Sequence, residues 1–460
     1  MPTPITGIIV LLLAAVFFWL GRRQALHARQ AGIPLHSLPH FYGSFAALAA
    51  GLPALLLLAV MAIGDDILFR QMVTAFYPAD LATRPGFNEQ IVLAQIENLV
   101  AGVDFGAAES WAREAAAAWQ GWLAISAQLT SLCCLTLALA GGFFALWRIH
   151  PELRARNLVE RTVVWLLAAS SVIAILTTIG IVFSVIFESL RFFALVPVTD
   201  FLFGLTWNPQ FEGAERAGSG GGEAGYGSVP LFVGTFLISV IALCVAVPVG
   251  LFSAIYLSEY ASLRNRALIK PLMEILAGVP TVVYGFFAAL TVAPLIRQTG
   301  LSVGLDVASE SALAAGLVMG IMIIPFVSSL SDDVINAVPQ SLRDAALGLG
   351  STRAEMVRQV VLPAALPGVV AAILLAVSRA VGETMIVVMA AGLAANLSLN
   401  PLDAVTTVTS QIVTILVGDQ EFESAKTLSA FALALTLIVI TLRLNFFALQ
   451  IVKKYREQYD

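Results

Sequence analysis

The sequence predicts an all-α polytopic membrane protein, and three observations lead to that fold class. Hydrophobic residues make up 59% of the 460 residues and charged residues only 12%, whereas an average soluble protein carries about 25% charged residues. The apolar residues gather in blocks of about 20, the length that a helix needs to cross a hydrocarbon core about 30 Å thick. Basic residues cluster on alternate sides of these blocks. A soluble enzyme, a nucleic-acid binder and a disulfide scaffold are thereby excluded.

Nine blocks are predicted to span the membrane, each about 17 to 25 residues long or slightly longer. The first differs from a signal peptide, because Arg22, Arg23 and Arg29 follow it and nothing basic precedes it. A signal peptide carries its charge in front, so we expect an uncleaved anchor with its N-terminus outside. The predicted spans are 4–20, 43–63, 119–147, 162–188, 229–258, 271–294, 310–330, 366–391 and 427–447.

The distribution of Lys and Arg predicts the orientation of these spans. With the N-terminus outside, 17 of the 25 basic residues fall in inner segments, counting Arg443 at the inner end of the last span; seven fall outside, and Arg379 lies near the middle of a span. This excess obeys the positive-inside rule and places the C-terminus in the cytoplasm. The weakest span, 119–147, has Trp119 and Trp122 at one end and Trp147 at the other, where interfacial aromatic residues belong.

The spans divide the chain into five predicted parts. A glycine-rich run, Gly218 to Gly222, is typical of a flexible spacer in an outer loop. The five parts are two N-terminal spans (1–63), an acidic outer region (64–118), a third extra span with a basic inner loop (119–160), a six-span core (161–450) with a long inner loop (331–365), and a cytoplasmic tail (451–460).

The inner loop 331–365 is the most informative polar segment, because a plain connection between spans needs only a few residues. Ser341, with Asp344 three residues later, has the pattern of a helix start. The stretch that follows is rich in Ala and Leu, and Gly350 can take the left-handed conformation that ends a helix. A short helix is therefore predicted in this loop.

A second helix is predicted after the glycine. Thr352 and Glu355 form a capping-box pattern, and the helix that they open runs to Pro363. We interpret the whole loop as a helical handle that a cytoplasmic partner contacts.

The handle resembles the signature of the permease subunits of bacterial ABC importers, which reads Glu-Ala-Ala, three residues, Gly, nine residues, Ile, any residue, Leu-Pro. The spacing matches throughout, with Asp in place of Glu and Val in place of Ile. The resemblance implies a coupling helix that docks on a separate ATPase subunit; an ordinary surface hairpin is the alternative. The residues that carry it are Asp344, Ala345, Ala346, Gly350, Val360, Leu362 and Pro363.

The chain lacks the sequence that binds ATP in the P-loop manner, because no lysine follows a glycine as GxxxxGK[ST] requires. We expect no cofactor in this chain and a partner ATPase that binds ATP and Mg. No HExxH motif or Cys/His cluster predicts a metal site.

Span 366–391 carries two charged residues near its middle, Arg379 and Glu383. A charge at the bilayer centre costs about 2.5 to 3.5 kcal/mol on insertion scales, so such residues usually line a pathway or pair with each other. At i and i+4 the two side chains are predicted to share a helical face and meet. Arg379 offers donors that fit a tetrahedral oxyanion, Glu383 would hold the guanidinium, and Thr384 adds a hydroxyl. A structural ion pair is the alternative.

The same segment is similar to the phosphate ABC importer. Residues 378–385 (SRAVGETM) resemble its RAxGET stretch, and residues 201–211 (FLFGLTWNPQF) are similar to its PstC-type permease subunit. The match covers about residues 160–450, and it implies the six-helix permease core of a type I ABC importer behind about three extra helices. It also implies a bacterial inner-membrane complex with a PstA-type permease subunit, two PstB-type ATPase subunits and a PstS-type periplasmic phosphate-binding protein.

The substrate and the energy source stay open at this point. The nearer alternative is the same machine for another oxyanion, such as molybdate or phosphonate. The alternative from another class is a secondary transporter without an ATPase, in which Arg379 and Glu383 would relay protons or ions. Uptake without any ATPase would favour that second alternative.

Overall fold

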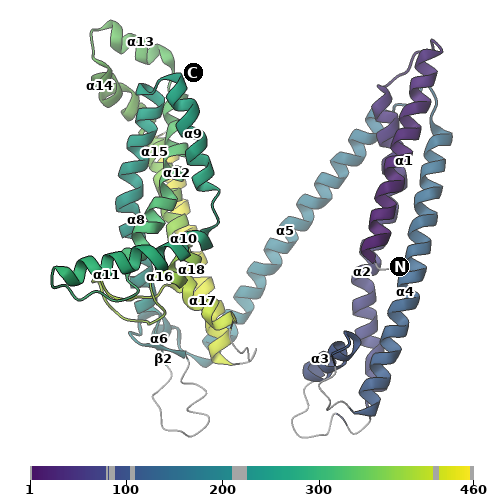
Figure 1. Ribbon diagram of the computed structural model, residues 1–460, viewed down its shortest axis with the longest axis horizontal. Coiled ribbons are helices and arrows are strands. Elements are labelled where there is room, and N and C mark those ends of the chain that lie inside the picture. Colours follow the sequence, from purple (N-terminus) through teal and green to yellow (C-terminus); the bar gives the residue numbers. More distant parts are fainter. Residues whose placement is uncertain are drawn as a thin grey trace. The chain divides into compact units, whose positions relative to one another are not determined.

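The computed structural model describes residues 3–78, 81, 89–103, 109–209, 225–417 and 424–455. These residues are mostly helical, and nine of their helices are long and apolar enough to cross a membrane (Figure 1). The predicted all-α polytopic fold is confirmed. The chain separates into two compact units, Met1–Leu176 and Thr177–Asp460. The predicted spacer Gly218 to Gly222 lies outside the described residues.

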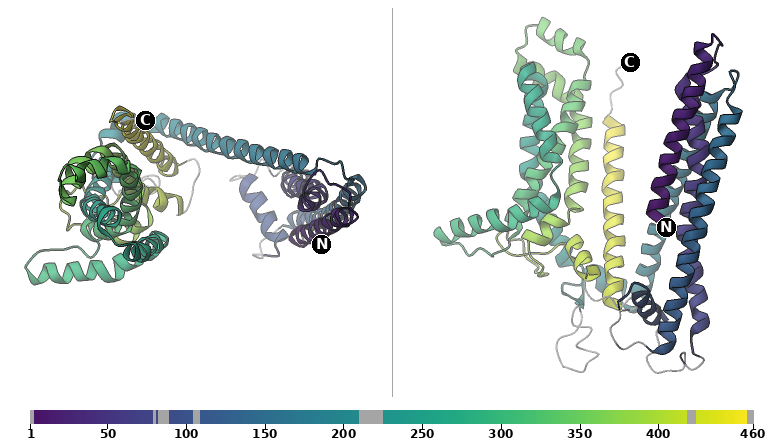
Figure 2. Two further views of the ribbon diagram at one scale, coloured as in Figure 1. Left: turned by 90° about the horizontal axis from the view of Figure 1, so that it is seen from above. Right: turned by 45° about the vertical axis from the view of Figure 1, so that its right-hand side comes forward.

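Three long helices build the first unit, and they lie side by side in every view (Figures 1 and 2). They are α1 (Thr3–Gln30), α2 (Pro39–Val73) and α4 (Ser110–Arg148). A Cβ atom at Gly141 of α4 would lie 2.1 Å from the Ala49 carbonyl oxygen of α2, so glycine permits the close approach. Small residues at helix contacts are the usual means of packing in lipid, where burial of apolar surface brings little gain.

The predicted outer region 64–118 is in part an extension of the membrane helices. Helix α2 continues to Val73, ten residues past its predicted span, and α4 begins at Ser110, nine residues before its predicted span. Both helices therefore extend beyond their apolar blocks. A 3-10 turn (Thr74–Phe76) and α3 (Glu89–Val100) lie between them. The apolar faces of these segments meet in a small cluster around Phe69, Ile96 and Trp119.

The boundary between the two units falls within helix α5 (Ala155–Leu195), after Leu176. The side chains of residues 167–184 are all exposed, although the segment is strongly apolar. Near its end, Phe192 is fully buried in an aromatic group with Phe201 and Tyr226. The exposed stretch has the surface expected of a helix that lipid or another subunit covers.

One end of the second unit is built around this aromatic group. Trp207 packs edge-to-face on Tyr226 and pairs with it across a two-residue antiparallel ladder. The elements are α6 (Val198–Phe203), β1 (Trp207–Asn208) and β2 (Gly225–Tyr226).

The centre of the second unit is the contact between α8 (Val229–Ile255) and α12 (Ala312–Ala337). Among the candidate spans, α12 has the largest buried share. Helices α15 (Leu362–Val381) and α18 (Ala425–Tyr455) pack on each other beside this pair. Ile238, Met319 and Ile323 lie in the main core, all at most 1% exposed.

The predicted span 271–294 is not one helix. Helix α9 (Leu263–Ala277) ends before Gly278, and a new helical stretch begins after Pro280. Proline disfavours the helical conformation in the residue before it, which explains the break. In Figure 1, α9 and α12 run in roughly the same direction, whereas α11 runs roughly perpendicular to both. The second stretch comprises α10 (Thr281–Phe287), a π-helical turn (Ala288–Val292) and α11 (Ala293–Ser302).

The predicted span 366–391 is also interrupted. Helix α15 ends at Val381, and α16 (Met385–Ala390) begins after three non-helical residues. The predicted shared face of Arg379 and Glu383 is therefore wrong, because Glu383 lies beyond the end of the helix. Its carbonyl accepts a 2.7 Å hydrogen bond from the Thr409 hydroxyl. Thr409 belongs to α17 (Val408–Val417), a helix absent from the predicted spans.

The handle has the two predicted helical stretches on either side of Gly350. They are α13 (Gln340–Gly348) and α14 (Arg353–Met356). Gly350 has φ +90°, a left-handed conformation that favours glycine. The capping box of Thr352 and Glu355 is present, so the start of the second helix is confirmed.

Two details of the handle differ from the prediction. Helix α13 begins at Gln340, with Pro339 at the N-cap position, so Ser341 does not cap it. The second helix does not end at Pro363, because a π-helical turn (Val357–Val361) leads directly into α15. Pro363 therefore lies inside a continuous helical run, two residues after the π-helical turn.

Candidate functional site

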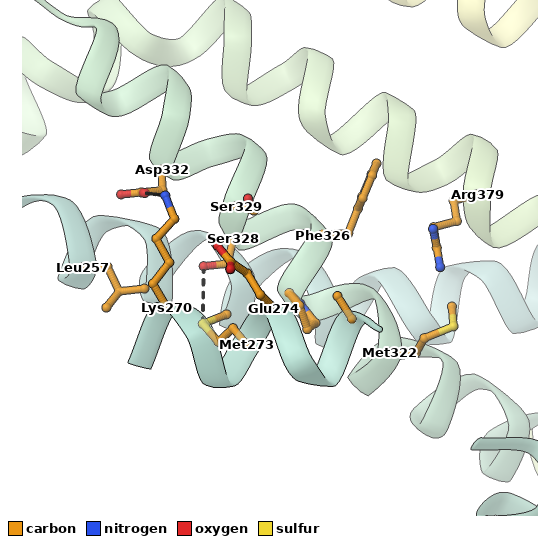
Figure 3. A pocket seen from close by; sticks show the side chains of 12 residues that line it. Leu257, Lys270, Met273, Glu274, Met322, Phe326, Ser328, Ser329, Asp332 and Arg379 are labelled. Atoms are coloured by element: carbon orange, nitrogen blue, oxygen red, sulfur yellow. Dashed lines mark hydrogen bonds and ion pairs between the residues drawn. The ribbon is translucent and has the colours of Figure 1, made fainter. Parts of the chain in front are cut away.

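A cavity of about 260 Å³ lies in the second unit, between α9, α12 and α15 (Figure 3). It mixes apolar walls with charged and hydroxyl groups, which is the usual character of a small-molecule site. The lining residues are Leu257, Lys270, Met273, Glu274, Ala277, Met322, Pro325, Phe326, Ser328, Ser329, Asp332 and Arg379.

Helix α15 contributes Arg379 to the wall of the cavity. Its guanidinium carbon lies 5.6 Å from the centroid of the Phe326 ring, a cation–π contact. Within the described part of the chain, no carboxylate forms an ion pair with Arg379, and Glu383 in particular does not. The N–H donors of the guanidinium are therefore free to bind a ligand that enters the cavity.

Glu383 and Thr384 do not line this cavity. Both lie in the non-helical segment between α15 and α16, and both are partly buried. The Thr384 hydroxyl is 3.4 Å from the Gly382 carbonyl oxygen, a weak contact within the same segment. Of the three predicted pathway residues, the structure thus brings only Arg379 to the cavity.

The opposite end of the cavity holds a buried ionic cluster on Asp332, whose side chain is 2% exposed. Lys270 Nζ lies 3.0 Å from its carboxylate, Arg266 donates to both carboxylate oxygens at 3.1 and 3.2 Å, and Asn336 donates at 2.8 Å. The hydrogen bond to Asp332 raises the pKa of Lys270, so this amine stays protonated at neutral pH. Glu274 adds a negative charge to the wall.

Asp332 was not a predicted functional residue. The apolar block ends at residue 330, so the sequence places Asp332 in the inner loop, whereas α12 extends to Ala337 and buries it. The spacing of Arg266 and Lys270, one helical turn apart, was the available signal.

The handle presents an exposed side and a buried side. Asp344 and Ala345 are exposed, and so are Leu347 and Leu349, at 42% and 88%. Ala346 faces inward, in a cluster with residues of α12 and of the turn before α15. Exposed leucines on a short polar helix are typical of a surface that a partner covers.

The other predicted docking residues lie at the turn and beyond the handle's second helix. Gly350 is exposed at the turn between the two helices, Pro363 is exposed at the start of α15, and Leu362 is partly buried beside the inward-facing cluster.

Helices of membrane length, a polar cavity among them and an exposed helical handle are the features expected of a polytopic permease. The chain belongs to the family of ABC transporter permeases. A relative from Bacillus subtilis, "Probable ABC transporter permease protein YqgH", is 31% identical over 292 residues, which are 63% of this chain and 87% of the relative.

Two family descriptions match separate parts of the chain. Residues 246–457 match "Binding-protein-dependent transport system inner membrane component". Residues 8–177 match "Phosphate ATP-binding cassette transporter". The extra N-terminal helices therefore have a family match of their own.

Further relatives carry the name "Phosphate transport system permease protein PstC". The protein from Haemophilus influenzae is 35% identical over 153 residues, 30% of this chain and 49% of the relative. "PstC 1" from Mycobacterium tuberculosis has the same identity over the same length, 45% of the relative. This chain thus matches about half the length of the PstC relatives. A solved structure of the MetNI methionine ABC transporter covers 50% of this chain and 94% of its own at 18% identity, with a TM-score of 0.36.

Proposed function

We propose that this chain is a transmembrane permease subunit of an ATP-driven phosphate importer and forms half of its translocation pathway. The names of the PstC relatives and the description matched by residues 8–177 support phosphate as the substrate. The observation that carries the proposal is the position of Arg379, a charged residue on a membrane helix that faces a cavity without a carboxylate partner.

The chemistry of Arg379 suits a tetrahedral oxyanion. A guanidinium presents a planar set of N–H donors and stays charged at every physiological pH, so it can bind phosphate with two parallel hydrogen bonds. The Phe326 ring on which it lies does not neutralise it. Ser329 supplies an exposed hydroxyl to the same cavity. Phosphate is expected to bind next to Arg379 and away from Glu274, because the negative charge of the Glu274 carboxylate would repel it.

Other subunits of the proposed complex bind ATP, complete the pathway and deliver phosphate. Two PstB-type ATPase subunits bind ATP and Mg, and one of them contacts the handle through Asp344, Ala345, Ala346 and Gly350, with Leu362 and Pro363 following. A PstA-type permease subunit forms the other half of the pathway, and a PstS-type protein delivers phosphate. The chain lies in the lipid of a bacterial inner membrane with its N-terminus periplasmic and its C-terminus cytoplasmic.

The test is phosphate uptake by the complete transporter with Arg379→Gln. We expect uptake to fall by at least tenfold, since an interaction with a charged group contributes about 1.5 to 3 kcal/mol, while all subunits still co-purify. Arg443→Gln is the matched control, because Arg443 is an exposed arginine on the neighbouring helix α18 and does not line the cavity. Unchanged uptake in Arg379→Gln would refute the role, and loss of assembly would assign Arg379 to structure.

Two further arms separate the alternatives. Competition by molybdate or a phosphonate that exceeds competition by phosphate would identify another oxyanion as the substrate. Uptake that persists without the ATPase subunits would favour a secondary transporter.

A further inference from the structure

Arg343 is a buried arginine on a helix, α13, whose residues are mostly exposed. It lies on α13, whose next residues, Asp344 and Ala345, are exposed. Its own side chain is only 9% exposed. A guanidinium is rarely buried unless it is paired and hydrogen-bonded, so its partners indicate what it does there.

The guanidinium of Arg343 joins three elements of the second unit. Its Nε donates to Glu259 Oε1 at 3.0 Å, and its NH2 group lies 2.9 Å from the same oxygen. Glu259 is also only 9% exposed, and it lies in the π-helical turn (Tyr256–Tyr260) that follows α8. The remaining donors bind the carbonyls of Ile335, at 2.7 Å, and Val338. These carbonyls belong to the last turn and the C-cap of α12.

All three nitrogens of the Arg343 guanidinium have a partner in this arrangement. The last carbonyls of a helix have no partner within the helix, and a cation at that end also interacts favourably with the helix dipole. The ion pair with Glu259 adds a third fixed point. A buried ion pair is a weak source of stability compared with apolar side chains of similar size. What it provides here is a fixed geometry between the handle and the ends of two membrane helices.

Helix α12 connects this point to the cavity. Asp332, Ser329 and Phe326 project from α12 into the cavity wall, and Phe326 lies against the Arg379 guanidinium (Figure 3). Helix α12 is also packed along α8 for most of its length. A displacement of α13 that is carried through Arg343 would therefore move the end of α12, and with it the residues that face Arg379.

We propose that Arg343 is the positioning residue that transmits motion of the handle to α8 and α12, and that Glu259 is its required partner. The inference rests on the proposed function, in which an ATPase subunit moves the handle. Arg343 does not contact substrate or nucleotide in this role. It holds the handle and the two helix ends together, so that ATP-driven movement changes the cavity.

The experiment measures phosphate transported per ATP hydrolysed by the complete transporter in proteoliposomes. For Arg343→Gln and Glu259→Gln we expect the ratio to fall about tenfold, within the range typical of coupling between sites, while ATP hydrolysis and co-purification of the ATPase subunits persist. Arg264→Gln is the matched control, because Arg264 is an exposed arginine of the same cytoplasmic face, and its ratio should equal that of the unmodified transporter.

The reversed pair, Arg343→Glu with Glu259→Arg, provides the rescue. It restores the attraction between α13 and the end of α8 but not the hydrogen bonds to the Ile335 and Val338 carbonyls of α12, so its ratio should lie above that of Arg343→Glu and below that of the unmodified transporter. A merely structural role would show as reduced melting temperature with an unchanged ratio, and that result would overturn the inference.

Two results distinguish this inference from the proposed function. If the unmodified transporter hydrolyses ATP but moves no phosphate, the proposed function fails. If it moves phosphate and Arg343→Gln does so with an equal ratio, the inference fails alone. Loss of the ATPase subunits from both Gln variants would assign the pair to docking and would also refute transmission.

Discussion

The carboxylate of Asp332 joins the C-terminal end of α12 to α9. It accepts hydrogen bonds from Arg266 and Lys270 of α9 and from Asn336 of its own helix. Its neighbour Asp333 is 67% exposed and lies 3.8 Å from Lys270. The two adjacent carboxylates therefore form a matched pair, one buried and shared by two cations, the other in contact with solvent.

We expect Asp332→Asn to lower the free energy of unfolding by about 2 kcal/mol. This is less than the roughly 3 to 5 kcal/mol typical of a fully buried pair, because Arg266 and Lys270 are 32% and 35% exposed and water can solvate them. Asp333→Asn should change it by less than about 0.5 kcal/mol. The midpoint of thermal unfolding of the purified protein measures both, and equal values for the two variants would contradict the assigned role of Asp332.

The importance of a single residue could be predicted from the sequence where its charge differs from an apolar surrounding. Arg379 stood out because a charge within an apolar block is costly. Arg343 and Asp332 did not, since a charge in a polar loop is ordinary, and only the fold shows that these two are buried. Glu383 was assigned to the correct region, but its relation to Arg379 depended on a continuous helix that the structure does not contain.

At the scale of elements, the contact between α8 and α12 depends on glycine at the crossing. A Cβ atom at Gly250 would lie 2.8 Å from Val327 Cβ and 3.1 Å from the Ile324 carbonyl oxygen. Both neighbours belong to α12 and are held by their own helix, so neither can move away easily. The small residue is therefore what sets the distance between the two helices.

Gly250→Val should destabilise the protein by about 1 to 3 kcal/mol, the usual cost of overpacking. Gly180→Val is the control, because no atom lies within 4 Å of a Cβ atom at Gly180 in α5, and its stability should stay within about 0.5 kcal/mol. Thermal unfolding of the two variants in the same detergent gives the comparison. A larger loss in Gly180→Val than in Gly250→Val would contradict the assigned contact.

The helices themselves were largely predictable, and their interruptions were not. Apolar length and capping patterns locate α1, α8 and the handle, because these signals act within a few residues of the chain. The end of α15 at Val381 is marked only by Gly382, and a single glycine inside an apolar block is a weak signal for a helix end. Helix α17 has a mixture of hydroxyl and branched side chains that is too short and too polar for a span, so its place beside α16 follows from tertiary packing.

For the whole molecule, each hydrophobic cluster of the described residues belongs to one unit. The four clusters of the first unit contain no residue beyond Ala155, and the three of the second contain none before Phe192. Each unit thus has its own core, in agreement with their separate family matches.

A chain shortened to residues 155–460 should therefore fold and co-purify with the ATPase subunits. Residues 1–424 are the contrasting truncation, because they lack α18, whose Leu428 and Leu433 are buried in the second unit. Size-exclusion chromatography in detergent checks both. Aggregation of 155–460 to the same extent as 1–424 would show that the second unit needs the first.

The hydrogen bond between Thr409 and Glu383 also sets an order of events during synthesis. Non-helical backbone at membrane depth must be satisfied by protein or by water in a cavity, and the two residues are 26 positions apart in the chain. At roughly 5 to 20 residues per second, the ribosome adds Thr409 about 1 to 5 s after Glu383. The interruption after α15 can acquire this bond only once Thr409 has been added, so the Glu383 carbonyl needs water or another part of the protein as its partner until α17 is in place.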